Sequence, residues 1–140
     1  MAAEEFFREF EHTGDLGIEV FASSRAELLA RAAIAMSQLM VEAQRVRSIE
    51  SRQIEVYADS DADLIHDLLA GALNLFLGDG FIWRDVKIEE ANKGVTADFS
   101  GEMFDPERHN LLTEIKAVTY HQLSVVESPS DWRARIIFDV

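Results

Sequence analysis

IEVFASSRAELLARAAIAMSQLM (residues 18–40) and IEVYADSDADLIHDLLAGALNLF (residues 54–76) carry the same pattern at an offset of 36 residues. Each copy predicts a strand, a short turn and a helix. Two copies are too few for a stacked repeat array, so the pattern indicates an internal duplication within one domain, residues 1–140. The identical pairs are Ile18/Ile54, Glu19/Glu55, Val20/Val56, Ala22/Ala58, Ser24/Ser60, Ala26/Ala62, Leu28/Leu64 and Leu39/Leu75.

Both predicted helices have recognisable ends. Ser24 stands three residues before Glu27, and Ser60 three before Asp63, which is the signature of a capped helix start. Gly80 closes the run Gly-Asp-Gly, where a glycine is expected after a helix C-terminus. The apolar residues at helical spacing are Leu28, Leu29, Ala32, Met36, Leu39 and Met40 in the first helix and Leu64, Ile65, Leu68, Leu69, Ala72, Leu73 and Phe76 in the second.

The rest of the chain is predicted to form mainly strands. Residues 95–103 alternate between apolar and polar, which places Met103 on the buried face and Glu102 on the solvated one. A polar, proline-containing loop follows at residues 105–110. The sum is an α+β fold in which two helices pack on a mixed, mainly antiparallel sheet. The other expected strands are residues 6–11, 86–88, 114–127 and 132–140.

Composition excludes several classes of protein. The chain has no cysteine, which rules out disulfides, thiolate metal sites and a cysteine nucleophile. Its net charge is −13, with 26 acidic residues against 13 basic ones, so direct strong binding to RNA or to an anionic membrane is not expected. No apolar run reaches the roughly 18 residues of a membrane span. The acidic first ten residues lack the layout of a signal peptide, and we expect a cytoplasmic protein.

Three carboxylates are candidates for a metal site. Asp15 lies in a loop between two glycines, and Asp139 precedes Val140, whose free carboxylate ends the chain. If the first and last strands are close, these groups converge, and oxygen-only ligands favour Ca²⁺ or Mg²⁺ over zinc or copper. The alternative is that Asp15 caps a turn and Asp139 is a solvated strand end.

Lys116 and the histidines are the other polar candidates. Lys116 interrupts the strand-like run EIKAVTYH at residues 114–121, where it is either functional or a charge paired with Glu114 on an edge strand. His12 could orient the loop of Asp15. His66 is expected to be solvated on the polar side of the second helix. The spacings between His12, His109 and His121 match no local metal motif.

Taken together in order, these segments resemble the archease family. The matching segments are His12-Thr13-Gly14-Asp15-Leu16-Gly17-Ile18, Gly101-Glu102, Asp105 with Arg108-His109, residues 114–121, and the closing Trp132 with Phe138-Asp139. Two departures are Gly14, where the family usually has alanine, and a second helix without the family's usual tryptophan.

The resemblance implies a function that composition does not show. Archeases are accessory proteins of the RtcB-type RNA ligase and help it to become guanylylated and to turn over repeatedly in tRNA splicing or RNA repair. The resemblance also implies a divalent cation, foremost Ca²⁺ with Mg²⁺ or Mn²⁺ as alternatives, held by Asp15, Asp139 and Val140. Lys116 matches a lysine regarded as functionally important in the family.

Two other functions stay open from the residues alone. One is a small metal-dependent hydrolase or phosphotransferase using Asp15, Asp139, Lys116 and His12, since a carboxylate-bound cation and a lysine can stabilise phosphoryl transfer. The chain offers no evident general base or nucleotide cradle for it. The other is a general chaperone-like interaction protein.

Overall fold

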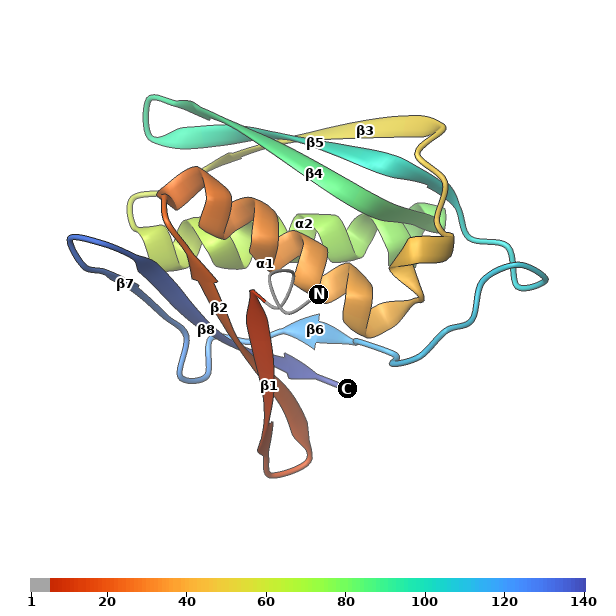
Figure 1. The fold of residues 1–140 in the computed structure, drawn as a ribbon, viewed down its shortest axis with the longest axis horizontal. Helices are drawn as coiled ribbons and strands as arrows, with labels where there is room; N and C mark the ends of the chain where they lie inside the picture. The colour runs from red at the N-terminus through yellow and green to blue at the C-terminus, as the bar shows by residue number, and fades with distance from the viewer. Residues whose placement is uncertain (1–5) are drawn as a thin grey trace.

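Two helices lie between two β-sheets in the computed structural model, which describes residues 6–140 except for the side chain of His12 (Figure 1). The α+β class is confirmed, but the strands that we expected in one sheet are divided between two. The elements are β1 (Phe7–His12), β2 (Asp15–Ala22), α1 (Arg25–Met40), a 3-10 turn η2 (Ala43–Arg45), β3 (Glu50–Tyr57), α2 (Asp61–Asp79), β4 (Phe81–Ala91), β5 (Gly94–Met103), β6 (Ala117–Val118), β7 (Ser124–Glu127) and β8 (Trp132–Asp139).

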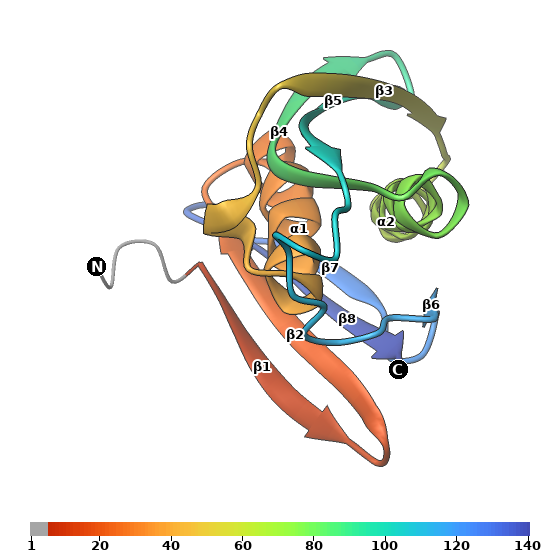
Figure 2. The ribbon, with the colours of Figure 1, turned by 90° about the vertical axis from the view of Figure 1, so that its right-hand side faces the viewer.

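The first sheet has five strands in the order β1-β2-β8-β6, with β7 also paired to β8. The second sheet has three strands in the order β3-β5-β4. Every strand pairing within residues 6–140 is antiparallel, so the parallel component allowed by a mixed sheet is not found there. Figure 2 shows the helices held between the sheets in a second view.

Both helices begin as the sequence predicts, and α2 also ends as predicted. The Ser24 side chain accepts a hydrogen bond from the Glu27 amide, and Ser60 accepts one from the Asp63 amide, each at 3.1 Å. Gly80 terminates α2 with a φ of +77°, a left-handed conformation that suits glycine. The predicted duplication therefore corresponds to two strand–turn–helix units.

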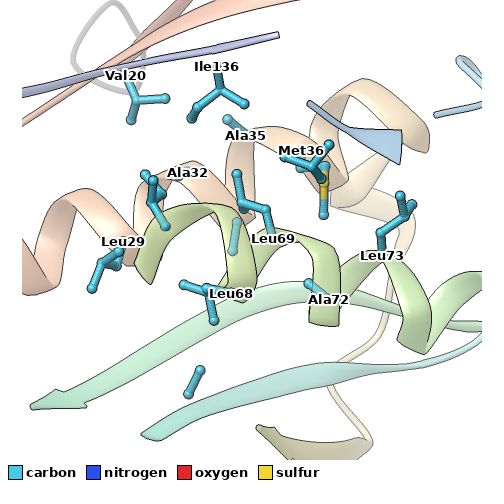
Figure 3. Packing of buried hydrophobic residues seen from close by; sticks show 14 of the residues in the cluster. Val20, Leu29, Ala32, Ala35, Met36, Leu68, Leu69, Ala72, Leu73 and Ile136 are labelled. Carbon is cyan, nitrogen blue, oxygen red and sulfur yellow. The ribbon is translucent and has the colours of Figure 1, made fainter. Parts of the chain in front are cut away.

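The hydrophobic core lies between the layers. Figure 3 shows apolar side chains of α1 and α2 facing one another, with Val20 of β2 and Ile136 of β8 against them. All the apolar helix positions predicted above are buried except Phe76, which is partly buried. No helix in residues 6–140 is long and apolar enough to cross a membrane.

The predicted strand at residues 114–127 is wrong as a continuous element. Two short strands replace it: β6 at Ala117–Val118 and β7 at Ser124–Glu127. The chain turns between them, from Tyr120 to Leu123. The Thr119 hydroxyl donates to the Ile137 carbonyl at 2.8 Å, and Gln122 has a φ of +52°. Local β-propensity is high here, but the turn ends the pairing.

The end of β5 reverses the predicted faces. Glu102 is only 4% exposed, whereas Met103 is 42% exposed. A buried carboxylate is stable only when charged or polar groups compensate for its lost hydration. Those groups come from Arg47, 55 residues earlier, and from the loop that follows β5, so the alternation of β5 alone could not reveal them.

His66 is not the solvated residue that we expected. Its side chain is 13% exposed, and its ring stacks on Tyr120 with 3.8 Å between the ring centroids. Its Nε2 lies 3.0 Å from the Val118 carbonyl oxygen and its Nδ1 3.0 Å from Asp67 Oδ1. His66 therefore links α2 to β6, close to Lys116 in the chain. Burial and the charges of Asp67 and Asp63 raise the pKa of the Tyr120 hydroxyl.

Candidate functional site

The turn between β1 and β2 positions Asp15. Thr13 and Gly14 form a two-residue connection with φ angles of +22° and +83°, and His12 pairs with Asp15 across it. Asp15 is therefore the first residue of β2. The His12 side chain, which we expected to orient this loop, lies outside the described atoms.

Strand pairing brings Asp15 beside Asp139. Leu16 pairs with Phe138, so one step further along the antiparallel ladder places Asp15 opposite Asp139. Ile18, Val20, Ala134 and Ile136 are buried toward the helices, so the alternating positions Asp15 and Asp139 share the other face of the sheet. Val140 follows Asp139 at the same end. The sequence posed the condition that the first and last strands be close. It is the second strand, β2, that pairs with the last, β8, while β1 pairs with β2 on its other side.

Lys116 reaches the same end from the other edge of β8. Its amide donates to the Asp139 carbonyl at 2.7 Å, and the next residue, Ala117, pairs with Asp139. The register therefore places Lys116 beside Val140. Its side chain is exposed. Asp15, Asp139, Val140 and Lys116 are thus gathered at one end of the five-stranded sheet from segments up to 125 residues apart in sequence.

A hollow of about 460 Å³ opens at this end of the sheet. It is lined by Glu9, Phe10, Glu11, Asp15, Leu16, Thr113 and Val140. Glu9 and Glu11 are exposed acids that the sequence analysis did not single out, although their alternation in β1 places them with Leu16 on one face. A larger hollow of about 630 Å³ contains none of the predicted site residues.

The donor chemistry of this end suits a hard cation. Asp15, Asp139 and the terminal carboxylate of Val140 offer only oxygen atoms, as Ca²⁺ and Mg²⁺ require. The described side chains of residues 6–140 contain no cluster of three or more His, Cys, Asp or Glu that could hold a metal ion. The two aspartate side chains alone are therefore not a complete site, and the expectation that the Val140 carboxylate joins them stays a prediction.

A buried ionic network fixes the segment that leads to Lys116. Glu102 accepts from the Arg47 amide at 2.7 Å, lies 3.0 Å from His109 Nε2, and accepts a hydrogen bond from Arg108. The Asp105 amide donates to His109 Nδ1 at 2.9 Å, so Nε2 of the neutral ring carries the proton and donates to Glu102. The network ties residues 105–109 to the end of β5.

The network also determines the charge state of Glu102. Burial alone would raise the pKa of its carboxyl, but the hydrogen bonds from Arg47, Arg108 and His109 outweigh it and lower the pKa to about 2. Glu102 is thus ionised and fully paired. The nearby pair Arg108-His109 is the sequence signal for this network, but it pairs with Glu102 only because the loop folds back on β5.

Known proteins resemble this chain over nearly its whole length. The model of the Archease protein family matches residues 7–140. "Protein archease" of Pyrococcus abyssi is 33% identical over 139 residues, covering 96% of this chain and 98% of that protein. "Protein archease" of Methanopyrus kandleri is 33% identical over 138 residues, covering 96% and 99%. The solution structure of protein 1598 of Methanobacterium thermoautotrophicum matches with a TM-score of 0.80 at 29% identity, covering 97% of this chain and 99% of that one.

Proposed function

The chain belongs to the archease family, and on that premise we propose that it is a non-catalytic activator of an RtcB-type RNA ligase. In this role it promotes guanylylation of the ligase and its multiple turnover in tRNA splicing or RNA repair. It acts in the cytoplasm on the ligase, and the ligase alone contacts the RNA.

The gathering of Asp15, Asp139, Val140 and Lys116 at one sheet end is the observation that supports this proposal most directly. The carboxylates are the groups that would hold a divalent cation, with Ca²⁺ foremost and Mg²⁺ or Mn²⁺ as alternatives. Such a cation would supply positive charge for phosphate oxygens. Lys116, exposed at the same sheet end beside Val140, contacts a nucleotide phosphate or a ligase carboxylate, and His12 orients Asp15.

The charge of the chain supports the choice of partner. Proteins that grip RNA directly neutralise its phosphates with lysine and arginine. Here acids outnumber bases 26 to 13, so the chain as a whole repels polyanions. A protein of this kind is better suited to the ligase than to the ligase's RNA.

Ligation with RNA in large excess over the cognate ligase tests the proposal. We expect many turnovers with the native protein and no stimulation with Asp139→Ala. Asp79→Ala is the matched control, because Asp79 is an exposed aspartate at the end of α2 and belongs to neither strand of the site. Equal ligation with and without the native protein would refute the activator role.

The same preparations separate the two classes of function. A small metal-dependent hydrolase would cleave phosphoesters without the ligase and would lose that activity on Asp139→Ala. We expect no such cleavage by the protein alone. Cleavage that requires Asp139 would replace the activator role with an enzymatic one.

A further inference from the structure

The outer face of the five-stranded sheet is the side turned away from both helices. Ile18 and Val20 of β2 are fully buried toward the helices, so Glu19 and Phe21 point outward. Antiparallel pairing places Arg8 and Arg135 in the row of Glu19, and Arg133 in the row of Phe21. Figures 1 and 2 both show α1 and α2 on one side of β2 and β8; the outer face is the other side of these strands.

Three arginines, Arg8, Arg133 and Arg135, form what we call the arginine patch on this outer face. Glu19 is the acid in their rows, with its carboxylate 2.6 Å from Arg8 Nη2 and 3.4 Å from Arg135 Nη1. Three arginines against one glutamate leave two positive charges there, on a chain with a net charge of −13. Arg133 is exposed and makes no hydrogen bond or ion pair with the residues described.

The patch surrounds a small hollow of about 190 Å³. Its lining includes Glu19, Ser124, Val126, Arg133 and Arg135, so a polar rim and an exposed valine lie together. Arginine beside apolar side chains is the composition that protein–protein interfaces favour.

Arg135 is held in place before any partner arrives. Its guanidinium carbon lies 3.9 Å from the centroid of the Phe10 ring, and its Nε donates to Gln122 Oε1 at 3.1 Å. The ring rests on Gly17, where an added Cβ would lie only 2.3 Å from Phe10 Cζ. Because the arginine is already ordered, little conformational entropy remains to be lost on binding.

Opposite charges occupy the two ends of this face. Asp139 and Arg135 both point outward from β8, four residues apart, which is about 13 Å along a strand. Asp15 adds to the negative end and Arg133 extends the positive one. A partner that covered the arginine patch would therefore also adjoin the carboxylates of the candidate site.

We propose that an acidic segment of the partner ligase docks on the arginine patch, with a carboxylate received by Arg133 in the hollow. This inference rests on the proposed function, because the ligase is the partner assigned there. Arginine binds carboxylate through two parallel hydrogen bonds, and Arg133 has its donors available. An RNA backbone is disfavoured as the occupant, since RNA binding rests on neutralising several phosphates and the patch has only about two uncompensated positive charges, with Glu19 within it.

Direct binding of the fluorescently labelled cognate ligase, measured by anisotropy, tests the docking site. We expect Arg133→Glu to raise the Kd by about tenfold or more and to reduce its dependence on salt. Arg84→Glu makes the same change of charge at an exposed arginine of β4, on the other sheet, and should leave the Kd within about twofold. Thermal unfolding followed by circular dichroism checks that both variants fold.

Ligation distinguishes failure of this inference from failure of the proposed function. Arg133→Glu should regain full stimulation at raised concentration, whereas Asp139→Ala should not. Unchanged binding by Arg133→Glu, with stimulation by the native protein intact, would overturn the docking site alone. No binding or stimulation by the native protein would overturn both. Binding of a 20-nucleotide single-stranded RNA that Arg133→Glu abolishes, with ligase binding unchanged, would overturn the inference in favour of a nucleic-acid site.

Discussion

Gly14 has a φ angle of +83°, in the left-handed region that residues with a side chain adopt only with strain. The space around an added Cβ is empty within 4 Å, so the requirement for glycine comes from the backbone and not from a neighbour. The turn before Asp15 therefore has a conformation suited to glycine.

Gly14→Ala is expected to lower the free energy of unfolding by about 1 kcal/mol, because alanine must adopt a left-handed conformation. Gly78→Ala is the matched control, since Gly78 lies within α2 with open space around it and alanine favours helix. Urea unfolding should show that Gly14→Ala lowers the free energy of unfolding and that Gly78→Ala raises it. Two substitutions that shift stability in the same direction would contradict the turn conformation.

Glu102 is the residue whose ionisation matters most to stability. Its pKa is lowered from 4.5 to about 2 in the folded protein, so the unfolded chain binds its proton more tightly. Unfolding in acid therefore takes up a proton at this group. The stabilisation is complete above about pH 5 and is lost as the pH falls toward 2.

Glu102→Gln is expected to lower the free energy of unfolding by up to about 3 kcal/mol at pH 7 and by much less at pH 3. The reason is that the native carboxylate loses its advantage in acid, while glutamine has no proton to gain. Urea unfolding at a series of pH values measures the difference. Glu89→Gln, at an exposed position of β4, should show no such convergence with the native protein. A pH-independent difference for Glu102→Gln would mean that its ionisation is not the cause.

The two strand–helix units are joined by a contact between equivalent positions. Residues 25 and 61 are 36 apart, the offset of the duplication, and each is the first residue of its helix. Arg25 Nε lies 2.7 Å from Asp61 Oδ1, and Arg25 Nη1 lies 2.6 Å from Glu90 Oε1 of β4. The copies have thus diverged to opposite charges where they meet.

A double-mutant cycle with Arg25→Ala and Asp61→Ala should give a coupling of about 1 kcal/mol. The pair is only partly shielded from water, which limits the expected value. The cycle also cancels the separate effect of Asp61 on the helix dipole. Arg45 with Glu42 is the control pair. Its charged atoms are 3.7 Å apart, a longer distance than in the Arg25 pair, and it should show coupling near zero. Equal coupling energies for both pairs would show that the Arg25–Asp61 contact stabilises the fold no more than the control ion pair does.

At the scale of the whole molecule, the candidate site includes Val140, the last residue of the chain, directly after β8. Addition of Gly-Ser after Val140 removes the free carboxylate from its place beside Asp139, and we expect Ca²⁺ affinity to fall by about tenfold or more. Isothermal titration calorimetry measures the change, and the same dipeptide added before Met1 is the control. Unchanged affinity would exclude Val140 from the ligands.

Local features of the sequence were predicted well. Both helices, their serine caps and the glycine after α2 depend on interactions within a few residues, and these are visible in the pattern. The structure brings Asp15, Asp139 and Lys116 to one end of the sheet, and their assignment as site residues stays a prediction. The metal, the ligase and the role of each residue stay predictions.

Long-range packing decided the features that the pattern missed. The buried place of Glu102 depends on Arg47, 55 residues earlier, and on the loop after β5 folding back with His109. The place of His66 depends on Tyr120. A polar residue is assigned to the surface from local pattern because its partners are not local. The division of the strands into two sheets is likewise decided by packing between segments that are far apart in the sequence.

The sequence alone determined both helices and the duplication, because periodicity and capping act over a few residues. Tertiary structure alone decided that β2 and β8 are neighbours and therefore that Asp15 faces Asp139. It also decided which side of the sheet carries the arginine patch. Strand register is set by burial of one face against the helices, and that burial requires segments from both ends of the chain to pack together.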